Sequence, residues 1–280
     1  FSQSLSYAFR DPFSVLWLAG FSEALQRAGA TMVLLPTQGA DGVDLDVIRR
    51  ASIDGLAALC ATNPALEVAQ RSGLRVVDTN DQDPDGSWVA IDDHAAGAEV
   101  GRHVRRLGHT DVALLISGHQ PDGRRVPDTP VTIDDLPSGG LYDTSTRVRG
   151  FVAGLGDGCR IRMIVATANS RDAGRIAGGF AVDRHDRPTA VICTGDILAF
   201  GVLDALADRG LVPGRDITVT GFDDLPDTAR MGLTTVRQPI VERGRLAGEL
   251  LLDPGRSPRQ IIVPHHLVVR SSSGPSAENT

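Results

Sequence analysis

The segment 190–220 constrains the fold more than any other part of the chain. An apolar run at Ala190–Cys193 leads directly into a helical pattern that begins at Asp196, and a second apolar run follows at 217–220. Apolar residues within the helical pattern recur at the spacing of one helix face, and Gly210 marks its end. A strand, a helix and a second strand in this order predict a βαβ unit with parallel strands. Open α/β sheets bind small ligands beyond the carboxyl ends of such strands.

Strand-like and helix-like segments alternate along the rest of the chain. The expected helices are 12–27, 45–52, 64–72, 94–107, 146–155, 171–182 and 240–252, and the expected strands are 31–35, 55–60, 74–77, 88–91, 112–116, 162–166 and 260–269. This alternation predicts an α/β fold whose parallel sheets are covered on both faces by helices. Because 280 residues suit two lobes better than one core, we expect two similar halves.

Composition and charge exclude several classes of protein. The longest apolar run, 15–21, is far shorter than the roughly 20 residues of a membrane helix, so no membrane association is expected. The net charge of −7 comes without the basic cluster that DNA binding draws on. The chain begins partway into an expected strand, so we expect an upstream segment, and any contact with DNA is expected to lie outside these residues. Three cysteines without CxxC spacing (Cys60, Cys159 and Cys193) predict reduced thiols rather than disulfides or a zinc site.

Signatures of catalysis are missing from the sequence. It contains no G-x-S-x-G, no H-E-x-x-H, no P-loop and no strand-linked G-x-G-x-x-G. His265 and His266 are adjacent in an expected strand and would point to opposite faces, which is poor geometry for chelation. We therefore expect that the chain is not an enzyme and that it has no catalytic residue, no metal site and no cofactor.

Three short motifs follow one another in the last third of the chain. They are T-G-D at 194–196, G-F-D-D at 221–224 and L-T-T-V-R-Q-P at 233–239. In this order and at this spacing they resemble the effector-binding core of LacI/GalR-type transcription regulators, and the resemblance extends over most of the chain. It implies a periplasmic-binding-protein-like fold of type I, in which two similar lobes, each a parallel sheet flanked by helices, enclose a ligand cleft.

The resemblance also implies that the chain crosses three times between the lobes, near Gly118, Arg237 and Ser257. Residues 1–117 and 238–257 would then form the N-terminal lobe, and residues 118–237 and 258–272 the C-terminal lobe. The segment 119–145 is rich in Pro and Gly and longer than the usual connection of the family, so we expect an irregular loop there. Residues 273–280 are expected to be a flexible tail.

Three residues match positions that the family uses to hold its effector. Asp223 is the first acid of the G-F-D-D turn and would accept hydrogen bonds from hydroxyl or amine groups. Arg147 matches the arginine of the R-x-x-G-F motif, whose planar fork suits hydroxyls or a carboxylate. Phe13 stands where the family often places an aromatic ring against the ligand, although a core position explains it equally well.

Further residues are expected to line the site with less support from the motifs. These are Tyr7, Asn169, Ile192, Gly195 and Gln238. Gly195 stands where sugar-responsive members often have Asn, and Asn169 stands where an aromatic often stacks, so a particular hexose is not indicated. Asp196 and Asp224 are expected to cap nearby backbone groups instead.

The resemblance implies the ligand-sensing and dimerising region of a bacterial transcription regulator. A small polar effector, most often a sugar or sugar derivative in this family, would modulate DNA binding by an N-terminal helix-turn-helix that is absent from this chain. We expect a cytoplasmic homodimer. An exported sugar-binding protein of an ABC transporter shares this architecture and is the alternative. The run 233–239 and the three thiols count against it.

Overall fold

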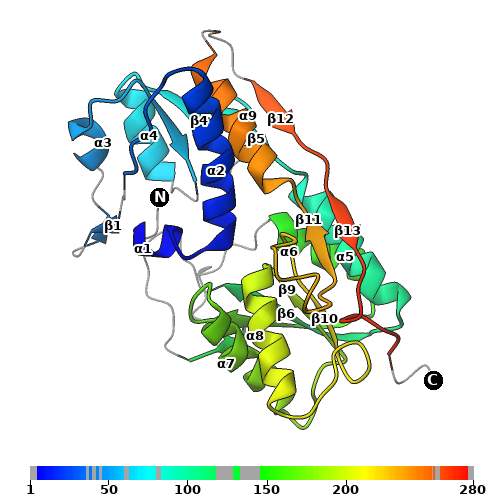
Figure 1. Cartoon of the computed structure of the whole chain (residues 1–280). Coiled ribbons are helices and arrows are strands. Elements are labelled where there is room, and N and C mark those ends of the chain that lie inside the picture. Colours follow the sequence, from blue (N-terminus) through cyan, green and yellow to red (C-terminus); the bar gives the residue numbers. More distant parts are fainter. Residues whose placement is uncertain are drawn as a thin grey trace. The chain divides into compact units, whose positions relative to one another are not determined.

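The computed structural model describes residues 5–35, 38–39, 42–43, 46–59, 63–79, 83–117, 129–132, 146–253, 255 and 259–276. Within these residues the chain forms two units. Unit 1 contains residues up to Ile91 and Pro239–Pro264, and unit 2 contains residues from Asp92 to Gln238 and from His265 onward. Each unit has a mainly parallel sheet flanked by helices (Figure 1), which confirms the predicted α/β class.

The sheet of unit 1 has four parallel strands. In spatial order they are β12 (Gln260–Ile262), β5 (Ser87–Ala90), β4 (Arg75–Asp78) and β3 (Gly55–Ala58). Its helices are α1 (Leu5–Ala8), α2 (Pro12–Arg27), α3 (Asp46–Arg50), α4 (Asn63–Arg71) and α9 (Ile240–Leu252). A short antiparallel pair joins β1 (Gln38–Gly39) to β2 (Gly42–Val43). Helix α9 packs against α2 and against the sheet, so a segment from late in the chain completes unit 1.

Local chemistry explains both the start and the packing of α2. The carboxylate of Asp11 accepts a hydrogen bond from the Ser14 backbone N–H, and Pro12 occupies the first helical position, where no N–H is needed. Trp17 and Phe21 are buried on the inward face, with their rings stacked 4.9 Å apart. The α2 backbone lies so close to α9 that a Cβ at Gly20 would stand 1.8 Å from the Val241 carbonyl oxygen.

The main sheet of unit 2 has five strands. In spatial order they are β10 (Thr218–Thr220), β9 (Ala190–Cys193), β6 (Asp111–Ser117), β8 (Arg160–Ala166) and β7 (Val131–Thr132), and only β7 is antiparallel to its neighbour. A separate antiparallel pair joins β11 (Thr235–Arg237) to β13 (His266–Val268). Helices α7 (Arg171–Val182) and α8 (Asp196–Ala207) pack together on one side of the sheet, and α5 (Asp93–Arg106) packs on α6 (Thr146–Leu155) (Figure 1).

Two of the expected lobe boundaries are wrong. The first crossing lies between Ile91 and Asp92 instead of near Gly118, because β6 pairs along its length with β8 and β9 of unit 2. The last crossing lies between Pro264 and His265 instead of near Ser257, because β12 pairs with β5 in unit 1 whereas β13 pairs with β11 in unit 2. The expected strand 260–269 is therefore two strands in different units.

Two expectations about irregular segments also need correction. Residues 31–35, expected to form a strand, have no regular secondary structure. Of the expected irregular loop 119–145 the structure describes only 129–132, and these residues include strand β7, which pairs with β8.

The expected flexible tail 273–280 is wrong for residues 273–276. The Gly274 carbonyl accepts a hydrogen bond from His109 Nε2 at 2.9 Å, and the Ser276 N–H donates to the Leu107 carbonyl at 2.8 Å. Burial lowers the pKa of His109, so its neutral ring provides this donor. Residues 277–280 lie outside the described part of the chain.

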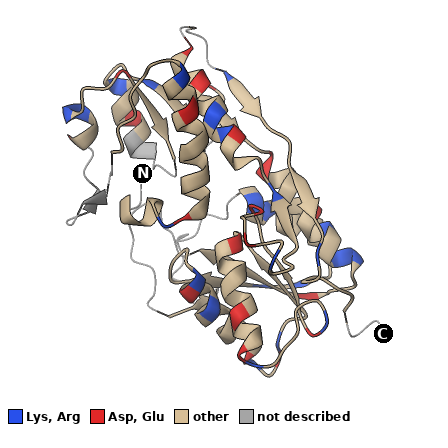
Figure 2. Cartoon of the chain, in the orientation of Figure 1, with Lys and Arg blue, Asp and Glu red and all other residues tan. Residues whose placement is uncertain are grey.

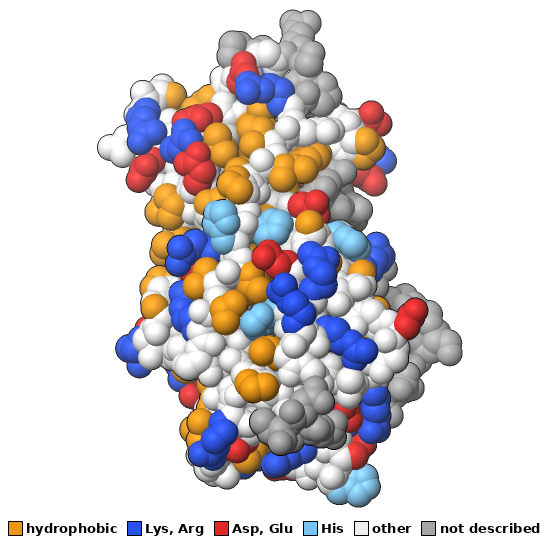
Figure 3. Space-filling view, turned by 90° about the vertical axis from the view of Figure 1, so that its right-hand side faces the viewer, with side chains coloured by type: hydrophobic (Ala, Val, Ile, Leu, Met, Phe, Trp, Pro, Cys, Tyr) orange, Lys and Arg blue, Asp and Glu red, His pale blue; other side chains and the backbone are white. Residues whose placement is uncertain are grey.

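Ion pairs join the two outer helices of unit 2. Arg171 holds Asp204 through two hydrogen bonds of 2.6 and 2.7 Å, and one turn further along Arg175 holds Asp208 at 2.6 Å. Figure 2 marks basic residues in blue and acidic residues in red along the ribbons of α7 and α8. Basic, acidic and hydrophobic side chains are interspersed on the face that Figure 3 presents.

Candidate functional site

The carboxyl ends of β8, β9 and β10 lie at one edge of the main sheet of unit 2. Each strand is followed by a turn that carries residues expected at the effector site, namely Asn169, Gly195 and Asp223. The strands are parallel and paired in register, with Thr220 opposite Ile192, so these turns share one edge. Parallel sheets of this kind place ligand-binding groups at that edge.

The turn 221–225 has an unusual backbone conformation. Asp223 and Asp224 both have positive φ, 125° and 55°, which are uncommon values for residues other than glycine. The Asp223 N–H donates to the Val236 carbonyl at 2.9 Å, so the turn is also paired with the segment that contains β11. Such conformations persist only where surrounding contacts fix them, and they occur often at functional sites.

Asp223 is half-buried and contacts two other expected site residues. The side-chain amide of Gln238 donates to Asp223 Oδ1 at 2.6 Å. A Cβ placed on Gly195 would lie 3.5 Å from Asp223 Oδ2. Asp223, Gln238 and Gly195 therefore lie side by side within unit 2.

Arg147, at the start of α6, lies in the same place. Its Nε donates to Asp93 Oδ1 at 2.9 Å, and its Nη1 donates to the Thr194 carbonyl at 2.5 Å. The guanidinium carbon stands 3.6 Å from the centroid of the Phe222 ring, a close cation–π contact. Arg147 thus contacts the residues just before Gly195 and just before Asp223. The carboxylate of Asp93 offsets its positive charge.

The expectation that Asp224 caps nearby backbone groups is incomplete, because its carboxylate also pairs with two arginines. Its carboxylate, with a side chain only 7% exposed, pairs with Arg237 at 2.6 Å and with Arg270 at 2.7 Å, and it accepts a hydrogen bond from Thr228. Burial opposes ionisation, but the hydrogen bonds from Thr228, Arg270 and Arg237 outweigh it and lower the pKa of Asp224. Asp224 therefore fixes the turn to β11 and to the segment after β13.

The expectation that Asp196 caps α8 is wrong. The N-cap residue is Gly195, and no side chain caps this helix end. The fully buried Asp196 carboxylate instead accepts hydrogen bonds from the Leu225 N–H at 2.9 Å and from the Thr235 hydroxyl at 2.6 Å. Burial raises the pKa of Asp196 to about 6 although these hydrogen bonds act in the opposite direction.

Two of the remaining expected residues of unit 2 differ in exposure. Ile192 has no exposed surface and packs within the core, because β9 lies between β10 and β6; the expectation that it lines a ligand site is not met in this structure. Asn169 is partly exposed in the turn after β8, one residue before Ser170, which caps α7.

Phe13 and Tyr7 belong to unit 1, and both are half-buried. Phe13 lies in the first turn of α2, and its ring centroid is 5.8 Å from the guanidinium carbon of Arg243. Arg243 is buried in the first turn of α9, and its Nη2 donates to the Thr79 carbonyl just beyond β4 at 2.9 Å. Sequence reasoning missed Arg243 and also Asp93. The available signal for Arg243 was its position on the inward face of an amphipathic helix, where a charged residue is unusual.

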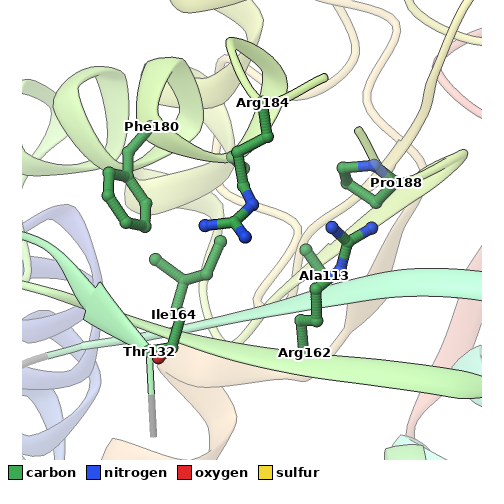
Figure 4. A pocket seen from close by; sticks show the side chains of 8 residues that line it. Ala113, Thr132, Arg162, Ile164, Phe180, Arg184 and Pro188 are labelled. Atoms are coloured by element: carbon green, nitrogen blue, oxygen red, sulfur yellow. The ribbon is translucent and has the colours of Figure 1, made fainter. Parts of the chain in front are cut away.

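A small cavity in unit 2 lies apart from these residues. It is lined by Ala113, Thr132, Arg162, Ile164, Phe180, Ala181, Arg184 and Pro188. Figure 4 shows Arg162 and Arg184 beside the apolar side chains of β8 and α7. Its volume is about 10 Å³, close to the space that one water needs, so it does not accommodate an effector.

In the described part of the chain, no three His, Cys, Asp or Glu side chains are arranged to hold a metal ion. Cys159 and Cys193 are free, whereas Cys60 lies outside the described residues. None of the described helices has the length and apolar character needed to cross a membrane.

Comparison with known proteins identifies the family. Residues 102–273 match the periplasmic binding protein-like domain. An HTH-type transcriptional regulator of Mycolicibacterium smegmatis is 34% identical over 293 residues, which cover 99% of this chain and 79% of that protein. A second, from Mycobacterium tuberculosis, is 32% identical with the same coverage.

Solved structures agree with these relatives. A LacI-family regulator of Corynebacterium glutamicum superposes with a TM-score of 0.80 at 26% identity, covering 97% of this chain and 83% of that one. A LacI-family regulator of Enterococcus faecium, solved with bound ribose, shares the fold with a TM-score of 0.74 at 22% identity, covering 95% and 96%.

The two α/β units and these matches define the class of protein as periplasmic-binding-protein-like. The chain belongs to the LacI family of transcription regulators and comprises their effector-binding domain. Because these relatives are transcription regulators, the prediction that the chain is not an enzyme is confirmed, and an exported transport protein is not favoured.

Proposed function

We propose that this domain senses a small polar effector, a sugar or sugar derivative, held by Asp223 and Arg147. One observation carries the proposal. The Arg147 guanidinium lies on Phe222 and donates to the Thr194 carbonyl, so a strong donor stands beside the turns that carry Asp223 and Gly195. A carboxylate and a guanidinium in one place suit the hydroxyl groups of a polyol, which both donate and accept hydrogen bonds.

The electrostatics favour a neutral ligand over an anion. Asp93 already offsets the charge of Arg147, so the guanidinium acts as a hydrogen-bond donor more than as a free cation. Two LacI-family structures that share this fold were solved with bound ribose, a neutral sugar. We expect Asn169, Gln238 and Gly195 to contact the same ligand from unit 2.

In this proposal Phe13 and Tyr7 of unit 1 contribute apolar ring surface to the effector. The effector would favour one arrangement of the two units, and it can do so only through its different affinity for the two arrangements. We infer that the domain forms a homodimer in the cytoplasm, and that the preferred arrangement changes how an N-terminal helix-turn-helix engages operator DNA.

A ligand screen followed by calorimetry tests this function. Thermal-shift measurements with ribose, glucose, sugar alcohols, nucleobases and sugar phosphates identify the compound that stabilises the domain most. Titration calorimetry with that compound is then repeated on Asp223→Ala and Arg147→Ala, with Asp208→Ala, at the exposed residue that follows α8, as the control. We expect at least about tenfold weaker binding in both site variants, equivalent to about 1.4 kcal/mol. Unchanged affinity in both would rule out the proposed site.

A further inference from the structure

Asp196 is the first residue of α8, but its side chain does not cap the start of that helix. Its carboxylate makes no capping hydrogen bond to α8 and is completely buried. We propose that Asp196 is a positioning residue, which holds the turn 222–225 in the conformation that presents Asp223. The effector role of Asp223 rests on the proposed function, whereas the effect of Asp196 on the turn can be measured without any effector.

Two of the three hydrogen bonds of Asp196 connect it to the two sides of Asp223. The Asp196 N–H donates to the Phe222 carbonyl at 2.8 Å, immediately before Asp223. The Leu225 N–H donates to Asp196 Oδ2 at 2.9 Å, two residues after Asp223. Asp196 therefore binds both ends of the short segment 222–225, which contains Asp223.

The third hydrogen bond connects the same carboxylate to β11. The Thr235 hydroxyl donates to Asp196 Oδ1 at 2.6 Å, and the next residue, Val236, accepts the hydrogen bond of the Asp223 N–H. Asp196 thus ties the turn and the strand that pairs with it to the start of α8. Such ties are needed because Asp223 and Asp224 both adopt left-handed conformations that non-glycine residues rarely occupy.

The glycine of the turn makes this arrangement possible. A Cβ on Gly221 would stand 2.2 Å from Asp196 Oδ1, closer than any real contact. The G-F-D-D motif therefore needs glycine at its first position because the Asp196 carboxylate occupies the adjacent space. The two motifs, T-G-D and G-F-D-D, act as one unit through this contact.

The carboxylate acts by accepting hydrogen bonds, and its negative charge is not required. The titratable groups that face it are Asp224 in the turn and Cys193 at the end of β9, and Arg237 and Arg270 are bound to Asp224. None of these cations pairs directly with Asp196 among the contacts of the described residues. An asparagine could accept from the Leu225 N–H through its oxygen and donate to Thr235 through its nitrogen.

Amide hydrogen exchange on the whole 280-residue chain tests the proposal. In Asp196→Ala the Leu225 N–H and the Thr235 hydroxyl lose their buried acceptor. We therefore expect the protection factors of the Leu225 amide, and of the Asp223 amide that pairs with the residue after Thr235, to fall by about tenfold or more. Protection of β6 and of α7 should stay at the wild-type level. Asp196→Asn should keep turn protection within about threefold of the wild type, since the amide retains an acceptor. Asp208→Ala, the matched control at the residue that follows α8, should change nothing in the turn.

Three outcomes would overturn the inference. Unchanged turn protection in Asp196→Ala would show that the turn holds itself. A uniform loss of protection throughout unit 2 would make Asp196 a general scaffold residue, and an Asp196→Asn variant as poorly protected as Asp196→Ala would show that charge is required.

A second variant covers the case in which Asp196→Ala does not fold. Thr235→Val preserves side-chain shape and removes the hydroxyl that donates to Asp196 at 2.6 Å and accepts a longer hydrogen bond of 3.4 Å from the Asp224 N–H. We expect a smaller, local loss of protection at Asp223 and Leu225, and no loss would contradict the proposal. Failure of the calorimetric test at Asp223 would remove the effector site but leave this exchange result standing, so the two failures are distinguishable.

Discussion

The guanidinium of Arg147 lies 3.6 Å above the ring of Phe222, the residue that immediately precedes Asp223. This contact joins the first turn of α6 to the turn after β10. A donor and an acceptor that are 76 positions apart in the sequence, at 147 and 223, are therefore held in one rigid group within unit 2. In the proposed function, this mutual positioning pre-organises the two residues for the effector.

Arg147→Lys should lower the free energy of unfolding of the domain by about 1–2 kcal/mol. A lysine keeps the charge beside Asp93 but cannot stack on Phe222 while it also donates to Thr194. Urea denaturation followed by circular dichroism measures the change. Arg102→Lys, on the exposed face of α5, is the control, and equal stability of both variants would show that the stacking contributes nothing.

Gly97→Ala should destabilise unit 2 by about 1–3 kcal/mol through overpacking. A Cβ at this position would stand 2.3 Å from the carbonyl oxygen of Arg147, so α5 and α6 would have to separate. The same displacement would move Arg147. Denaturation of Gly97→Ala beside Arg102→Ala, a truncation on the solvent side of α5, measures the cost, and wild-type stability would contradict the close packing.

Acidification should stabilise the wild type relative to Asp196→Asn. The pKa of Asp196 is raised by burial to about 6, above its ordinary value of 3.8, so the folded state binds the proton more tightly than the unfolded state. The stabilising contribution is thus present at low pH and lost as the pH rises through about 6. Between pH 8 and pH 5 we expect a relative gain of about 1 kcal/mol.

The buried histidines have the opposite effect on stability. Comparing the free energy of unfolding of the wild type with that of Asp196→Asn at each pH removes this effect. Burial lowers the pKa of His103 and of His109, so both make the fold less stable as the pH falls, equally in the two proteins. Thermal unfolding at several pH values supplies the data. A constant difference between the proteins would show that the pKa of Asp196 is not raised.

His109→Ala should cost about 2–4 kcal/mol, because the buried ring bonds to several groups at once. Its Nδ1 meets the Thr189 hydroxyl and its Nε2 meets the Thr218 hydroxyl and the Gly274 carbonyl, all within 3.0 Å. The exposed His185 provides the control. Hydrogen exchange should also show faster exchange at Ser272 and Gly274, and unaltered protection there would refute the anchoring role.

These 280 residues alone should not retard DNA in a gel-shift assay. The net charge of −7 opposes binding to a polyanion, and the face that Figure 3 presents carries both signs of charge. The DNA upstream of the encoding gene is the appropriate probe, with the same chain fused to a helix-turn-helix as the positive control. A specific, salt-sensitive shift by the unfused chain would contradict this expectation.

The helices were the most predictable part of the fold. Helices α2, α6, α7 and α9 begin and end at the predicted residues, because their apolar spacing and terminal residues are local properties of the sequence. Residues 31–35 are mostly apolar, as expected of a strand, but they do not pair with any strand in the described part of the chain. Pairing depends on residues far away in the chain, and so do the boundaries between the units: β6 could have joined either sheet on its pattern alone.

The candidate site, too, could be predicted only where its features are local in the sequence. The motifs that contain Arg147 and Asp223 were visible in the sequence, and the structure brings these two residues together through Phe222. The role of Asp196 was not visible, because an acid at a helix start most often caps it. Its true partners, Leu225 and Thr235, follow it by 29 and 39 residues, and only the folded sheet brings them together.

The three places where the chain passes from one unit to the other differ chemically. Pro239 and Pro264 stand at the second and third passages, whereas the first passage, Ile91 to Asp92, has no proline. A pyrrolidine ring fixes φ and restricts the residue before it, so the second and third connections carry a backbone restriction that the first one lacks. At the first connection the backbone is fixed instead by a side chain, because the carboxylate of Asp92 accepts a hydrogen bond from the Ala95 N–H at the start of α5, and the next residue, Asp93, pairs with Arg147.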